Sequence, residues 1–129
     1  MALNKSYNVS IGALTASAFG STTHEAFLSL APRDFNAAAS IKWDSLTGNG
    51  NLIAQIDFAA ESAPNAQWTN SLAFSGMSAS SMVNHAFYSS SDDQVKPLLP
   101  NARVRVTNRS TDANSSTYTN IVLKLLVES

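Results

Sequence analysis

Two arginines on one candidate strand, Arg103 and Arg105, are the residues best placed to do chemistry in this sequence. Side chains two positions apart on a strand point to the same face, so the two guanidinium groups should project together. A planar guanidinium binds a carboxylate through parallel hydrogen bonds, which favours contact with carboxylates on a partner protein. A solvated strand face is the alternative. RNA binding is disfavoured because no aromatic residue interleaves with the arginines.

The histidines and the spaced carboxylates do not form a catalytic arrangement. His24 and His85 match no metal-ligand spacing, and we expect His85 to be a hydrogen-bonded residue of the core or its boundary. Asp57 and Glu61 share a strand face at a separation of roughly 13 Å. That exceeds the roughly 5 to 9.5 Å between the carboxyl groups of glycosidases. We therefore expect Asp57 and Glu61 to lie on a solvated face.

The sequence also lacks the residue patterns that metal binding and thiol chemistry need. Asp92 and Asp93 follow a serine run but lack the spaced oxygen ligands of a calcium loop. The chain has no cysteine, which excludes disulfides, thiol nucleophiles and zinc sites built on thiolates. The sequence predicts no enzyme, no metal and no cofactor.

Apolar and polar residues alternate along eight segments, which predicts short β-strands. The segments are 7–14, 25–30, 37–46, 51–61, 67–74, 82–88, 102–108 and 117–127. No segment has the apolar spacing and caps of a helix. Eight strands separated by turns predict an antiparallel β-sandwich or jelly roll, with a barrel as the alternative.

The same alternation assigns side chains to the core or to the surface. It predicts Trp43 and Trp68 on core-facing positions and Tyr118 on the outer face of the last strand. The segment 48–51, Gly-Asn-Gly-Asn, predicts a tight hairpin turn because glycine and asparagine tolerate a positive φ.

The length of 129 residues fits one domain, 1–129, in which residues 1–20 form either an N-terminal arm or the start of the sandwich. Only 13% of residues are charged, about half the usual proportion. Ser, Thr and Asn together make up roughly a third of the chain. Small domains are normally kept apart by interspersed charges, so this composition predicts a surface covered by partners.

Several partner classes are disfavoured by charge and hydropathy. Eight basic and nine acidic residues give no positive excess for binding nucleic acid. No apolar stretch approaches the roughly 20 residues that span a bilayer. The first fifteen residues alternate rather than form an apolar run, so we expect no signal peptide and synthesis in the cytoplasm.

The order of features from Ile41 to Val127 resembles the small β-sandwich virion proteins of tailed bacteriophages, especially head decoration (cement) proteins. The features are the strand Ile41-Lys42-Trp43, the strand end Ala59-Ala60-Glu61-Ser62, the segment Gln67-Trp68-Thr69, the strand 102–108 and the terminal strand Ile121-Val122-Leu123-Lys124. The resemblance implies a non-enzymatic protein of the virion. Copies of it, as trimers or other rings, would bridge neighbouring major capsid proteins.

On this hypothesis a few surface residues would bind the partners. Arg103 and Arg105 would supply charged contacts, with Tyr88, Tyr118 and Phe35 as aromatic anchors. Two alternatives remain. One is a carbohydrate-binding β-sandwich that stacks a sugar on Trp43 or Trp68. The other is a different phage component, either a tail protein or the coat of a small RNA phage, whose fold needs C-terminal helices where 117–127 predicts a strand.

Overall fold

The computed structural model describes residues 5–30, 35–78, 81–88 and 100–128; for 35–36, 70–72, 74–76, 81–88 and 128 it describes the backbone alone. The described residues form eight strands and no helix. The strands are β1 (Lys5–Ala16), β2 (Ser21–Ser29), β3 (Phe35–Thr47), β4 (Gly50–Ala59), β5 (Thr69–Met77), β6 (Ser81–Tyr88), β7 (Asn101–Ser110) and β8 (Ser116–Glu128). The described ranges contain no helix long and apolar enough to cross a bilayer.

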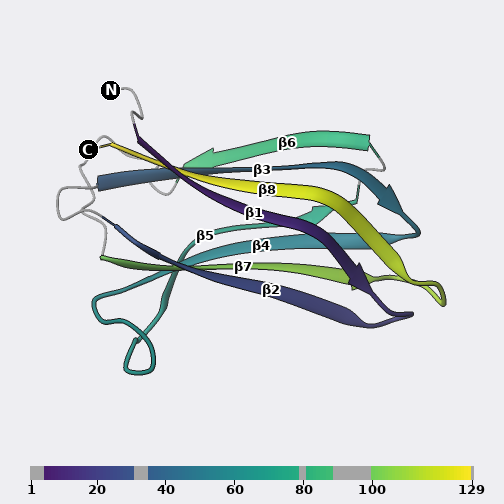
Figure 1. Cartoon of the computed structure of the whole chain (residues 1–129), viewed down its shortest axis with the longest axis horizontal. Helices are drawn as coiled ribbons and strands as arrows, with labels where there is room; N and C mark the ends of the chain where they lie inside the picture. The colour runs from purple at the N-terminus through teal and green to yellow at the C-terminus, as the bar shows by residue number, and fades with distance from the viewer. Residues whose placement is uncertain (1–4, 31–34, 79–80, 89–99, 129) are drawn as a thin grey trace.

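The strands form two antiparallel sheets packed face to face (Figure 1). The first sheet has the order β1-β8-β3-β6 and the second has the order β2-β7-β4-β5. Pairing is nested, because β1 pairs with β8, β2 with β7, β3 with β6 and β4 with β5. This winding is the jelly roll, so the predicted fold class is confirmed.

The core lies between the inner faces of the two sheets. It combines alternate residues of β3 and β8 from the first sheet with alternate residues of β4 and β7 from the second. Trp43 is fully buried, as predicted, and its ring meets Tyr118 edge-on with centroids 5.5 Å apart. Such a tilted aromatic pair adds stability beyond the burial of its area.

The glycine-rich segment 48–51 does not form a hairpin, so that prediction is wrong. It carries the chain from β3 in the first sheet to β4 in the second. Gly48 has a φ of 82°, and a Cβ atom there would lie 2.3 Å from the carbonyl oxygen of Ser115. Glycine is therefore required at position 48 by a close backbone approach as well as by conformation. A glycine-rich turn suits both a hairpin and a connection between two sheets, so the local sequence does not distinguish them.

Tyr118 is also placed differently from the prediction, because β8 changes face within its length. Ser116 and Tyr118 are buried at even positions, whereas Ile121 and Leu123 are buried at odd positions. Asn120 lies between them with a φ of 55°. β1 changes parity in the same way after Gly12, whose φ is 77°. Figure 1 shows β1 and β8 bending together along their length.

Candidate functional site

The outer face of the second sheet carries an ionic cluster centred on Asp57 of β4. Antiparallel pairing places Asp57 opposite Arg103 of β7. The Asp57 Oδ2 atom accepts hydrogen bonds from Arg103 Nε at 3.1 Å, Arg103 Nη2 at 2.8 Å and Arg105 Nη2 at 2.8 Å. Asp57 is 0% exposed, so the expectation of a solvated carboxylate is wrong for this residue.

The two arginines of the cluster have two acidic neighbours, because Glu25 of β2 lies opposite Arg105 in the register. Two guanidinium groups share one carboxylate, and their side chains remain 19% and 32% exposed at Arg103 and Arg105. Asp57 Oδ1 and Arg105 Nε are buried, and neither has a hydrogen-bond partner in the described structure. The arginines that the sequence assigned to a partner's carboxylates thus already bind a carboxylate of their own chain.

Trp68 lies on this outer face, beside the arginines, instead of in the core. The guanidinium carbon of Arg103 lies 4.7 Å from the centroid of the Trp68 ring, within the range of a cation–π contact. Phe27 of β2 lies opposite Arg103 in the register, and its ring centroid is 6.0 Å from that of Trp68 with a tilt of 41°. Trp68 precedes β5, so strand alternation did not apply to it, and its predicted core position is wrong.

A pocket of about 300 Å³, here called the Trp68 pocket, opens beside these aromatic rings. It lies where β2 ends, β7 begins and the β4–β5 loop passes, and its lining is Phe27, Leu28, Ser29, Ser62, Ala63, Trp68, Asn101 and Ala102. Asn101 steadies the loop, because its amide donates to the carbonyl of Ala60 at 3.3 Å. The volume is at the lower end of pockets that hold small organic ligands.

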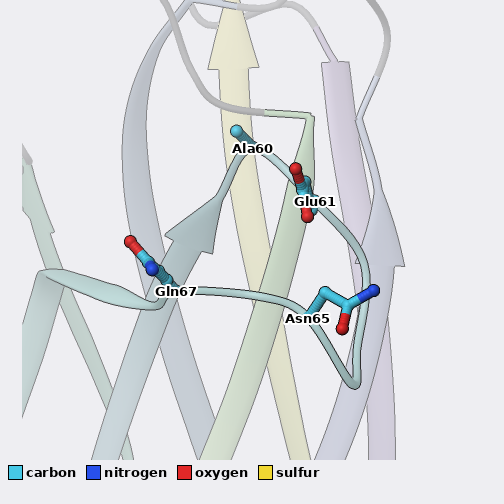
Figure 2. A pocket seen from close by; sticks show the side chains of 4 residues that line it. All are labelled: Ala60, Glu61, Asn65 and Gln67. Carbon is cyan, nitrogen blue, oxygen red and sulfur yellow. The ribbon is translucent and has the colours of Figure 1, made fainter.

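A second hollow, of about 290 Å³, lies on the same loop and is lined by Ala60, Glu61, Asn65 and Gln67. Figure 2 shows that the Asn65 and Gln67 side chains extend to opposite sides of the loop. A binding site for a small ligand needs polar groups that converge, so this hollow does not form one.

The remaining predicted site residues are not brought to this surface. Tyr118 is 0% exposed, and its hydroxyl donates toward the carbonyl oxygens of Gly50 at 3.0 Å and Met77 at 2.6 Å. Burial raises the pKa of Tyr118 to about 12. Tyr118 is therefore a core residue, and its predicted place on the outer face is wrong.

Other predicted residues fall partly outside the described structure. Phe35 lies in β3 opposite Glu128, and Tyr88 lies in β6 opposite Ala38, but their side chains are outside the described part, as is that of His85. Asp92 and Asp93 lie outside the described residues. Among the residues that the structure describes, no group of three His, Cys, Asp or Glu side chains could hold a metal ion.

Comparisons with known proteins place the chain by its fold. No family model matches it, and no curated protein matches its sequence. It is similar to a chain in the structure of the infectious bursal disease virus Gx strain, with a TM-score of 0.52 and 12% identity over 97% of this chain and 32% of the other. It is also similar to the enzymatically active domain of tailspike protein 4 of bacteriophage CBA120, with a TM-score of 0.52 and 10% identity over 95% and 19% of the two chains.

A third solved structure is TmCBM61 in complex with β-1,4-galactotriose, with a TM-score of 0.48 and 7% identity over 86% of this chain and 67% of the other. The chain spans about a third of the viral protein and about a fifth of the tailspike. At these identities the comparisons establish the fold alone: the protein is a jelly-roll β-sandwich.

Proposed function

We propose that this chain is a structural protein of a virus particle, and specifically a decoration protein that binds the major capsid protein of a tailed phage and copies of itself. The observation that carries the proposal is the jelly-roll winding, which aligns over 97% of the chain with a protein of a virus structure. The low proportion of charge, 13%, supports it, because such a surface is stabilised when partners cover it.

The geometry supports a recognition surface on the second sheet. Arg103 is held between Asp57 and Trp68, so its guanidinium is oriented before any partner arrives. Arginine and tryptophan are enriched among residues that dominate binding energy. The guanidinium groups of Arg103 and Arg105 remain partly exposed and suit a carboxylate on the capsid protein. On this proposal the protein has no catalytic role, binds neither nucleic acid nor membrane, and is incorporated into the virion after synthesis in the host cytoplasm.

Co-sedimentation with empty, expanded heads of the virus whose genome encodes the chain tests the proposal. We expect saturable binding at a fixed ratio to the major capsid protein and a raised melting temperature of the bound heads. The matched variants are Arg103→Ala, which should weaken binding, and Lys42→Ala, an exposed change on the opposite sheet, which should not. Absence of binding by the wild-type chain would overturn the proposal.

A carbohydrate-binding module is the second candidate, favoured by the exposed ring of Phe27 and the partly exposed ring of Trp68 beside polar groups. Trp68 and Phe27 could stack on a sugar ring, with Asn101 and the Ser29 and Ser62 hydroxyls in the same pocket. A glycan array followed by calorimetry tests this candidate. Binding that Trp68→Ala abolishes would support it, and absence of any glycan ligand would exclude it. Trp43 is fully buried and takes no part in it.

A further inference from the structure

Two large apolar side chains are exposed among the described residues, and they lie at opposite ends of β2. Phe19 is 71% exposed in the turn before β2, and Phe27 is 55% exposed near its end. The nine residues of β2 separate the two ends by roughly 26 Å. Figure 1 shows the β1–β2 turn at one end of the molecule and the β4–β5 loop at the other. Neither side chain can cover the other within one chain.

The turn that carries Phe19 is held rigidly in an unfavourable conformation. Phe19 has a φ of 52°, which a bulky side chain rarely adopts. Its backbone N–H donates to the carbonyl of Asp112 at 2.9 Å, and Ser110 N–H donates to the carbonyl of Gly20 at 2.8 Å. A strained aromatic residue that gains no burial in its own chain indicates that its side chain is used elsewhere.

The loop beneath Phe19 is fixed in turn by Asp112. Its carboxylate accepts hydrogen bonds from Asn49 Nδ2 at 2.6 Å and from the backbone N–H of Asn114 at 2.8 Å. These hydrogen bonds, that of Asn49 first, hold the pKa of Asp112 below its usual value. Phe19 therefore projects from two connected turns that are ordered without a partner, which reduces the entropy lost when it binds.

The Trp68 pocket lies beside Phe27, at the end of β2 opposite the Phe19 turn. It is a concave site of about 300 Å³ whose walls include Phe27, Trp68 and Ala63. A phenyl ring that enters it would meet two aromatic faces and cover the exposed ring of Phe27. Few charges oppose such a contact between copies, because the chain has a net charge of −1 and 13% charged residues.

We propose that Phe19 of one copy enters the Trp68 pocket of a second copy, so that the chains associate head to tail. Each copy then offers one aromatic knob and one pocket, and the contact joins two different surfaces. Contacts of this heterologous kind produce a closed ring or an open chain, depending on the rotation between copies. The inference deepens the proposed function and rests on it for the biological setting, whereas the contact itself is tested on the isolated chain.

Cysteine capture tests the contact directly, because the chain has no cysteine of its own. Ala18→Cys lies beside Phe19 and Ala63→Cys lies in the pocket, and both positions are exposed. Mixing the two variants under mild oxidation should give the mixed disulfide dimer, and the double variant should give a ladder of covalent oligomers. The matched control is Lys42→Cys, on the outer face of the first sheet, mixed with Ala63→Cys. Equal yields from the control and test pairs would overturn the inference.

Complementation distinguishes this heterologous contact from a two-fold one. Sedimentation velocity should show that Phe19→Ala and Ala63→Trp each weaken self-association at least about tenfold, as expected for a central contact. A mixture of the two variants should recover a dimer, because one retains the pocket and the other retains the knob. Both changes are at exposed positions, and circular dichroism will confirm that the variants fold. No recovery in the mixture would contradict the inference.

Capsid binding is measured separately, so the two proposals can fail independently. A chain that binds heads but remains monomeric, with no capture above the control, would retain the proposed function and overturn the head-to-tail contact. A chain that assembles through Phe19 but does not bind heads would retain the head-to-tail contact and overturn the proposed function. If Phe19→Ala lost head binding while self-association remained at the wild-type level, Phe19 would contact the capsid, and the inference would be wrong.

Discussion

Asp57 shows how one side chain can organise the surface of a sheet. It is buried and accepts hydrogen bonds from Arg103 and Arg105, and Arg103 in turn contacts Trp68. Removing one member of a buried charged group leaves the others without compensation, which is more destabilising than losing an exposed ion pair. The cluster therefore links the stability of the sheet to the shape of its outer face.

Asp57→Asn should lower the free energy of unfolding by about 2 to 3 kcal/mol, between the values for exposed and buried ion pairs because the guanidinium groups are partly solvated. Urea denaturation of the purified variant measures the change. Glu61→Gln, at an exposed carboxylate of the adjoining loop, is the control and should change it by less than about 0.5 kcal/mol. Equal effects of the two substitutions would show that Asp57 is not neutralised by the arginines.

Tyr118→Phe should lower the free energy of unfolding by about 1 to 2 kcal/mol, because the buried carbonyls of Gly50 and Met77 lose their donor. A pH series measures the second consequence. Burial raises the pKa of Tyr118 to about 12, whereas the unfolded chain ionises near 10, so the stabilising difference is complete below pH 10 and is lost toward pH 12. Wild type should lose stability over this range more steeply than the variant; parallel curves would contradict the assignment.

At the residue scale, the sequence predicted some burials correctly and missed others for a physical reason. Trp43 lies in a stretch of β3 with regular alternation, and it is buried as expected. The burial of Asp57 depends on β7 lying beside β4, a pairing between residues 46 positions apart. The sequence did hold a signal, because β4 carries an outward-facing aspartate and β7 carries two outward-facing arginines. Only the observed register shows that these two strands are neighbours.

The change of face in the first sheet is a property of neighbouring strands. Gly12 of β1 lies opposite Ile121 of β8, one residue beyond Asn120, so the two left-handed residues lie side by side. The Asn120 amide also donates to Asp44 of β3 at 2.7 Å. Such bulges bend a strand and increase its twist. Here the bend carries the C-terminal end of β1 and the N-terminal end of β8 toward the second sheet, where the Phe19 turn begins (Figure 1).

Gly12→Ala should lower the free energy of unfolding by about 1 to 2 kcal/mol through the backbone alone. A Cβ atom at Gly12 would meet nothing within 4 Å, so steric overlap with other elements does not contribute. Chemical denaturation measures the loss, and Ser10→Ala, exposed on the same strand, is the control with an expected change below about 0.5 kcal/mol. A neutral Gly12→Ala variant would contradict the left-handed conformation.

At the element scale, the sequence located the strands well and their interruptions poorly. All eight predicted segments overlap the observed strands. The shift of parity within β8 was missed because alternation was extended from 121–127 back through Asn120 to Tyr118. Asparagine tolerates the left-handed conformation without requiring it, so the sequence alone does not mark the position of the bulge.

At the scale of the molecule, low charge should dominate behaviour in solution. The calculated isoelectric point is about 6.0. Light scattering across pH 5 to 8 should show minimum solubility near pH 6, where electrostatic repulsion between copies vanishes. Ser6→Lys with Asn8→Lys, both exposed on β1, should move that minimum to higher pH. A minimum that stays in place would show that charge does not control the association of the chain.

The whole fold was only partly accessible from the sequence. Eight alternating segments with turns predicted a sandwich or jelly roll, and that prediction is confirmed. The strand order could not be predicted, because it depends on which distant strands pair. The glycine-rich turn at 48–51 illustrates the problem, since local chemistry favoured a hairpin whereas the pairing of β3 with β8 and of β4 with β7 sends the chain across the sandwich.

The nested pairing also determines the order in which the protein can fold during synthesis. β4 and β5 are close in sequence and can pair early, whereas β1 must wait for β8, which is synthesised after the other seven strands. Contacts between such distant segments make folding slow. Because β8 is the central partner of both β1 and β3, the first sheet forms only after β8 has emerged from the ribosome.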